Sequence, residues 1–116
     1  MRLLMTMLAL LGTFAIQAQE KNPVFEKDGD LVKATYFHDN GLVAQEGHYL
    51  NGALHGEWKM FDTNGNKLAI GQYSFGKKTG KWFFWDDNGL KEVDYVENRV
   101  ANVTQWNNGE AVVLNR

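Results

Sequence analysis

The sequence contains no cysteine and a single proline, Pro23. Without cysteine the chain has no disulfide framework, no thiolate metal site and no cysteine nucleophile. It also lacks an excess of basic residues: 12 Lys and Arg against 14 Asp and Glu give a formal net charge of -2, which argues against a nucleic-acid-binding protein. Hydrophobic residues nevertheless make up 44% of the 116 residues and aromatic residues 13%, so we expect one folded domain.

Charge is almost missing from the N-terminal segment as well. Arg2 is its only charged residue, and residues 3–16 are apolar apart from two threonines. A positive start, a short apolar run and a small residue, Ala18, at the exit are typical of a secretory signal peptide. We therefore expect residues 1–18 to be a signal peptide cleaved near Ala18-Gln19, and the protein to be exported to the periplasm or the extracellular space. The apolar run is shorter than the about 20 residues that span a bilayer, and a retained N-terminal anchor is the alternative.

The rest of the chain repeats itself at an offset of 24 residues. The recurring glycines are Gly41, Gly65 and Gly89, Gly47 and Gly71, Gly52 and Gly76, and Gly56 and Gly80. The recurring aromatic positions are Phe37, Phe61 and Trp85, Tyr49 and Tyr73, and Trp58 and Trp82, and a large apolar position recurs at Met60 and Phe84. After an N-terminal extension at residues 19–30, the expected repeat domain is 31–116, with units near 31–52, 53–76 and 77–98 and a degenerate C-terminal unit at 99–116. A worn terminal unit is typical of a repeat array.

Each unit has the pattern of two short strands joined by turns. In the second unit, residues 62–67 contain the Asp, Asn and Gly that turns use, and residues 76–80 form a second Gly-rich turn. Connections this short join antiparallel strands, and no sustained 3.6-residue period predicts a helix. We therefore expect an all-β fold, an antiparallel meander of tandem β-hairpins with about eight strands, two per repeat, in one elongated twisted sheet.

Glycines inside the expected strands suggest how a sheet of one layer is stabilised. Gly47 and Gly71 each precede a tyrosine by two residues, and so lie on the same face of the strand as that ring. A strand glycine leaves a gap that an aromatic side chain from a neighbouring strand can cover. We expect such gaps to be covered by a ladder of rings from Phe61, Tyr73, Trp82 and Trp85.

These residues carry a resemblance to a known family. The segments 56–65 and 71–82 resemble the MORN-repeat variant, whose pattern is Gly-x-Trp-x-x-Tyr-x-x-x-Gly followed by Tyr-x-x-Gly-x-x-x-Gly. Phe61 and Trp85 stand where the pattern has tyrosine, and the resemblance covers about Leu31 to Val100. It implies an array of β-hairpins that serves as a scaffold or binding surface. The family includes antitoxin-labelled bacterial members, and some classical MORN proteins associate with membranes or phospholipid.

The chain is also similar to short exported bacterial proteins labelled nicotinic acid mononucleotide adenylyltransferase. Such enzymes use a His-x-Gly-His phosphate motif on a larger α/β domain, whereas His38, His48 and His55 never occur at that spacing. The residues give the label no support. We expect no enzyme, and we assign no catalytic residue, cofactor or metal site.

Three clusters have a functional and a plain interpretation. His38 and His55 could approach one another across neighbouring loops, but a metal needs three or four ligands, so we expect surface histidines. Asp86 and Asp87 have the spacing of turn residues rather than of an acid–base pair. The lysines around Gly80 could contact anionic lipid, although a solvated loop is the preferred interpretation; these lysines are Lys77, Lys78 and Lys81.

The most informative segment is residues 82–85, four consecutive aromatic residues. Along a strand they alternate, so rings occur on both sides of a thin sheet and some ring surface stays exposed. Exposed Trp and Tyr are typical anchors for a partner. The candidate partner-binding residues are Trp58, Phe61, Tyr73, Trp82, Phe84 and Trp85. The expected partner is an unknown protein or polymer, with a membrane surface as the alternative. The structural explanation of the rings is that the curl of the sheet and the terminal segments cover both faces.

Overall fold

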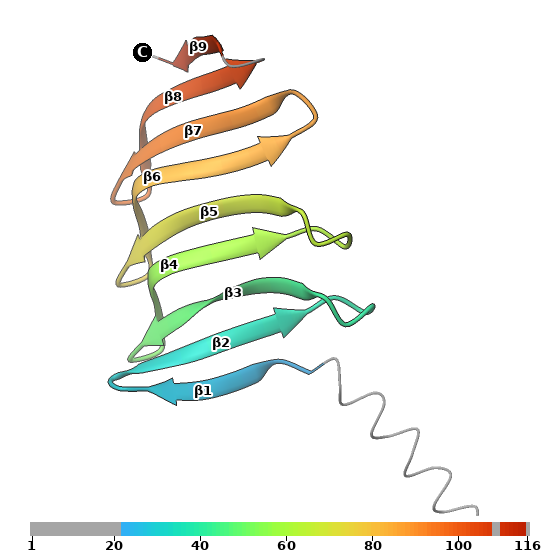
Figure 1. Cartoon of the computed structure of the whole chain (residues 1–116). Coiled ribbons are helices and arrows are strands. Elements are labelled where there is room, and N and C mark those ends of the chain that lie inside the picture. Colours follow the sequence, from blue (N-terminus) through green and yellow to red (C-terminus); the bar gives the residue numbers. More distant parts are fainter. Residues whose placement is uncertain (1–21, 108–109, 116) are drawn as a thin grey trace, which may run out of the picture.

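The structure is a computed structural model that describes residues 22–107 and 110–115. These residues form one antiparallel sheet in which every strand pairs with the next strand of the sequence (Figure 1). The strands are β1 (Val24–Asp28), β2 (Leu31–Phe37), β3 (Val43–Leu50), β4 (Ala53–Phe61), β5 (Lys67–Ser74), β6 (Lys77–Asp86), β7 (Gly89–Val96), β8 (Arg99–Asn107) and β9 (Glu110–Asn115). The expected all-β meander of hairpins is confirmed, and no helix occurs in the described ranges. The expected signal peptide, residues 1–18, lies outside them.

The strand pairs follow the repeat in the sequence. From residue 31 onward the chain forms eight strands, β2 to β9, with two in each of the four expected units. One further strand, β1, lies in the expected N-terminal extension and pairs with β2 through five residue pairs, from Val24↔Thr35 to Asp28↔Leu31. The sheet is open, with β1 at one edge and β9 at the other (Figure 1).

Two kinds of turn alternate along the sheet, one at each end of the strands. At one end, carboxylates hold the turn: Asp62 Oδ1 accepts the backbone N–H groups of Asn64 and Asn66, both at 2.9 Å. These hydrogen bonds, with that from the Asn66 backbone foremost, lower the pKa of Asp62. Asp86 Oδ1 likewise accepts the Asn88 N–H at 2.8 Å, so Asp62 and Asp86 act as the turn residues that the sequence predicts.

At the other end, tight turns have positive φ at both central residues. The pair Asn51 and Gly52 has φ of 49° and 82°, and the pair Phe75 and Gly76 has 49° and 86°. Positive φ at both positions is the geometry of a type I′ hairpin, whose twist matches that of the strands. The meander is therefore closed locally, turn by turn, without any long-range connection.

One face of the sheet, here called the core face, contains the buried residues. A row of small residues and rings crosses the strands: Ala34 on β2 lies opposite Gly47 on β3, and Trp58 on β4 lies opposite Gly71 on β5. The two tryptophans of this row, Trp58 and Trp82, are 2% and 1% exposed. Burial of this extent within a single layer requires that the rings lie flat against the backbone.

The indoles achieve this by covering glycines. A Cβ atom built on Gly47 would collide with the ring of Trp58, and a Cβ atom on Gly71 would collide with the ring of Trp82. Each indole N–H then donates a hydrogen bond of 3.0 Å to the carbonyl of the residue after that glycine, His48 or Gln72. The same placement therefore buries the ring and gives its N–H group a hydrogen-bond acceptor.

Backbone irregularities bring the indoles over the glycines. The pairing register shifts between Glu46 and His48 on β3, next to Gly47, and the shift recurs at Gly71 on β5. On the facing strands this register shift is accommodated at Gly56 and Gly80, whose φ values are 77° and 67°. Such bulges re-aim the next side chains, in this case Trp58 and Trp82.

The ladder of rings is present, with partly different members. The indoles and tyrosines on the core face meet edge to face: Tyr49–Trp58 at 5.3 Å, Trp58–Tyr73 at 6.4 Å, Tyr73–Trp82 at 5.0 Å and Trp82–Tyr95 at 5.9 Å between ring centroids. Edge-to-face contacts of this kind add about 0.5–1.5 kcal/mol per pair beyond the buried area. The ladder thus ties β3 to β7 together.

Among the four rings that the sequence assigned to glycine gaps, only Trp82 covers one of the described glycines. Tyr73 packs against the edges of both indoles instead. The placement of Phe61 and Trp85 over gaps was wrong, because the alternation of side chains along β4 and β6 puts them on the face opposite Trp58 and Trp82.

We expect Gly71→Val to lower the free energy of unfolding by about 1–3 kcal/mol, because the branched side chain needs the space that the Trp82 indole occupies. Urea unfolding followed by tryptophan fluorescence measures the change. The matched control is Ser74→Val on the same strand, where the side chain is exposed. Combining Gly71→Val with Trp82→Ala should cost less than the sum of the single changes. Equal stability of the two valine variants would contradict the account of a ring over glycine.

Candidate functional site

The face opposite the core face, here called the open face, carries a second group of apolar side chains. Strand register places Ile70 opposite Phe83, Trp85 opposite Leu90 and Leu90 opposite Trp106. Leu68, which is 43% exposed, lines a cavity together with Trp85. The group, here called the apolar strip, consists of Leu68, Ile70, Phe83, Trp85, Leu90 and Trp106. It runs across β5 to β8, and apart from Leu68 its members are half-buried.

The six candidate residues do not form one surface. Trp58 and Trp82 are buried on the core face, so their indoles stabilise the sheet rather than present a ring to solvent. Tyr73 and Phe84 are half-buried on the same face, with Phe84 stacked on Trp82 at 5.9 Å between centroids. Burial, followed by the charge of Tyr95, raises the pKa of Tyr73.

Phe61 and Trp85 lie on the open face and are half-buried there. Trp85 lies beside Phe83, with 6.3 Å between ring centroids, in the middle of the apolar strip. Of the candidate residues, Trp85 therefore has the clearest position in a surface that a partner could cover.

Sequence reasoning missed Leu68, Ile70, Leu90 and Trp106 as members of this surface. Trp106 lies 24 residues after Trp82 and so has the spacing of a core-face indole. The final unit is shorter, however, and Trp106 pairs with Leu90 on the open face. Its Nε1 atom is buried and has no hydrogen-bond partner among the described residues. Counting back along the strand pairs, rather than along the repeat, would have found it.

A cavity of about 270 Å³ lies where the apolar strip reaches the turns. Trp85 and Leu68 form its apolar wall, and the carboxylates of Asp62, Asp86 and Asp87 surround it. The Nζ atom of Lys67 lies 5.8 Å from the centroid of the Trp85 ring. The arrangement suits a cation–π contact, in which the ring face attracts positive charge.

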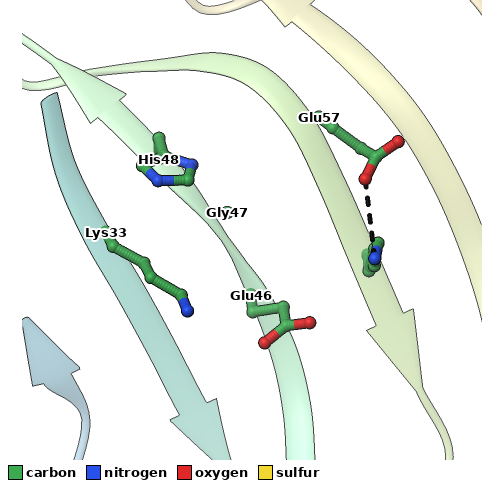
Figure 2. A pocket seen from close by; sticks show the side chains of 6 residues that line it. Lys33, Glu46, Gly47, His48 and Glu57 are labelled. Carbon is green, nitrogen blue, oxygen red and sulfur yellow. Dashed lines mark ion pairs between the residues drawn. The ribbon is translucent and has the colours of Figure 1, made fainter. Parts of the chain in front are cut away.

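The part of the open face nearer β1 is polar. Figure 2 shows Lys33, Glu46, His48 and Glu57 on three adjacent strands, where they line a cavity of about 220 Å³. Glu57 pairs with Lys59 at 3.6 Å. Charges of both signs are interleaved here, which is typical of cross-strand pairing that keeps a sheet surface solvated.

The three histidines lie at separate places on the sheet and form no common site. His38, at the β2–β3 turn, donates from Nε2 to the Phe61 carbonyl at 2.8 Å. His55 lies near the opposite end of the strands, across from His48, and its Nδ1 accepts the Phe75 N–H at 3.2 Å. His38 and His55 therefore do not approach one another, because successive turns of a meander lie at alternate ends. Within residues 22–107 and 110–115 no three potential metal ligands cluster.

The three lysines near Gly80 do not form one basic patch. Lys78 extends over the rings of Trp82 and Tyr95 on the core face, with its Nζ 5.3 Å and 5.1 Å from the ring centroids. Lys81 points to the open face and contacts Asp94 at 3.1 Å and Glu92 at 3.2 Å. These two carboxylates, Asp94 foremost, raise the pKa of Lys81.

Comparison with known families agrees with the hairpin geometry. Residues 54–74, which span most of β4, its turn and β5, match the family described as MORN repeat variant. This segment of the chain is similar to one MORN repeat. The match includes one member of each indole-over-glycine contact, Trp58 and Gly71, and the ladder ring Tyr73 that packs against Trp58. The MORN repeat family is not an enzyme family. No curated protein matches the chain significantly.

In the part of the chain that the structure describes, no helix has the length and apolar character needed to cross a bilayer.

The ring ladder also includes a pair of hydroxyl groups. Tyr36 and Tyr49 lie on the core face of β2 and β3, with 2.8 Å between their oxygens. This hydrogen bond, together with burial and the charge that Tyr36 would carry, raises the pKa of Tyr49 from 10.0 to about 12. The folded state therefore holds the Tyr49 proton more tightly than the unfolded state.

The stabilisation by the neutral Tyr49 hydroxyl should be complete below pH 10 and should be lost as the pH rises through about 12. Tyr36→Phe should make the decline in unfolding free energy over this window shallower, because it removes the hydrogen bond that is the main cause of the shift. Urea unfolding at a series of alkaline pH values measures this, with Tyr95→Phe as the control that leaves the pair intact. Identical pH dependence in wild type and Tyr36→Phe would show that the pair does not hold the proton.

Proposed function

We propose that this chain is an exported, non-catalytic MORN-like repeat module that binds another protein through the apolar strip on its open face. The observation that supports the proposal is the partial exposure of that strip on the uncovered face of a single-layer sheet. Contiguous apolar surface bordered by polar residues is typical of interaction sites in soluble proteins. Trp85 has the character of an anchor, since interface hot spots are rich in tryptophan.

The sheet also suits a scaffold role. Its strands pair only with their neighbours in the sequence, so the array gives one extended surface rather than a closed pocket. The rings on the core face form one ladder from β3 to β7, and the open face can vary without affecting them. A partner is then recognised by the complementarity of its surface to the extended surface of the sheet.

A non-catalytic role agrees with how the ionisable groups are used. Asp62 and Asp86 hold turns, and Lys81 is paired with two carboxylates. The family match also points to no enzymatic chemistry. An adenylyltransferase activity would require a nucleotide site that none of these groups supplies.

A protein partner is preferred over an anionic membrane. Lys78 covers rings on the core face and Lys81 is neutralised by Glu92 and Asp94. Of the three lysines, Lys77 at the start of β6 then lies exposed without such a contact among the described residues. One lysine contributes only about 1 kcal/mol at an anionic surface, which is weak for stable association.

Export makes a prediction of its own. Expressed with its complete N-terminus in a bacterial host, the protein should be recovered outside the cytoplasm with Gln19 as its first residue, as intact mass spectrometry would show. Leu10→Arg should keep the chain uncleaved in the cytoplasm, because a charge interrupts the apolar run. An uncleaved wild-type chain in the membrane fraction would indicate the retained anchor instead.

The binding proposal predicts a dependence on Trp85. Cross-linking of the exported protein in its own cells should capture a specific protein, and Trp85→Ala should reduce that capture by about tenfold, the usual effect of losing a central anchor. The control is Phe75→Ala, which removes a ring that is 68% exposed at the opposite end of the strands. Equal capture by wild type and Trp85→Ala would contradict a role for the apolar strip.

A further inference from the structure

We propose that the apolar strip binds a cationic amphipathic segment of a partner protein, with basic side chains on both sides of an apolar row. This inference rests on the proposed function and identifies the chemistry of its partner. It follows from the charges that border the strip, which are predominantly negative on each side.

On the side of the turns, three carboxylates lie around the end of the strip. Asp62, Asp86 and Asp87 line the cavity beside Trp85, and Lys67 is the cation among the cavity residues. Asp86 and Asp87 are exposed. A basic side chain of a partner that reaches past Trp85 would therefore enter a region of negative potential.

Trp85 adds a second, independent feature to this side. Its ring already has an ammonium group over it, because Lys67 Nζ lies 5.8 Å from the ring centroid. The position of Lys67 thus shows where a cation contacts the Trp85 ring. A guanidinium or ammonium group of a partner finds the same ring and the adjacent carboxylates.

On the inner side, toward the middle of the strands, carboxylates again outnumber lysines. Glu92 lies directly opposite Phe83, and Asp94 lies opposite Lys81. Lys81 contacts both carboxylates, so one positive charge balances two negative ones.

One further charged pair borders the strip at β4. Lys59, opposite Ile70, is balanced by its ion pair with Glu57 at 3.6 Å. The inner border of the strip therefore also keeps a negative excess.

This charge pattern favours one class of binding partner for the apolar strip over the others. A second copy of the chain would bring the same carboxylates against these, and like charges across an interface are unfavourable. An anionic bilayer or a nucleic acid would be repelled for the same reason. A segment with apolar residues on one side and Lys or Arg flanking them satisfies both the strip and its borders, whether it binds as a strand or as a helix.

The test uses two synthetic peptides of equal length, one of alternating leucine and lysine and one of alternating leucine and glutamate. Calorimetry with the mature protein should show binding of the lysine peptide, weakening as salt is added, and no binding of the glutamate peptide. Trp85→Ala and the double change Asp86→Asn with Asp87→Asn should each weaken binding by about tenfold. Phe75→Ala should bind like wild type, and Trp85→Phe controls for loss of folding because it retains a ring.

A second readout locates the peptide. The indole N–H resonances of Trp85 and Trp106 should shift on addition of the lysine peptide, whereas those of Trp58 and Trp82, buried on the core face, should stay in place. Binding that is unchanged in Trp85→Ala, or that moves the core-face signals alone, would overturn the inference.

Three other outcomes would also overturn it: equal binding of the glutamate peptide, salt-sensitive binding to vesicles of anionic lipid, or self-association that Trp85→Ala abolishes. The proposed function fails separately. If cross-linking in cells captures a protein through Trp85 and that protein lacks a basic amphipathic segment, the proposed binding function is supported. The proposal of a cationic partner segment is then contradicted. If no capture depends on Trp85, the function itself is wrong.

Discussion

The contact between an indole ring and the backbone of a strand glycine is the interaction on which this structure depends. A sheet of one layer has no second layer to bury its side chains, so a ring is buried only by lying flat on the sheet. Gly47 and Gly71 provide the space, and Trp58 and Trp82 fill it. The bulges that displace these indoles also leave carbonyl groups for their N–H groups, and each contact therefore stabilises both ring and backbone.

The two faces of the sheet have different roles because of this contact. Tyrosines complete the ladder between the indoles, so the rings of the core face largely bury one another. Strand alternation then leaves the other half of the side chains on the open face, where nothing in the described chain forms a second layer. Charged pairs keep part of that face solvated, and the remaining apolar strip around Trp85 is the region that a partner can cover.

Much of the fold was predictable, and less of the candidate site. The offset of 24 residues and the Asp, Asn and Gly turns predicted the hairpins, because turn geometry depends on local conformational preference. The role of Phe61 and Trp85 over glycine gaps was predicted incorrectly, since that ladder combined rings from both faces of the sheet. Trp106 shows the same limit: its spacing from Trp82 suggests the core face, but a shorter final unit places it on the open face. A register change of one residue moves a side chain across the sheet.

The sequence by itself determined the strands, the turns and the antiparallel order, because alternation, short connections and the φ preferences of Gly, Asn and Asp act within a few residues. Only the tertiary structure decided which rings share a surface and which carboxylates border it. That outcome depends on the register between neighbouring strands, and the bulges at Gly56 and Gly80 set this register through contacts that span 10 residues or more.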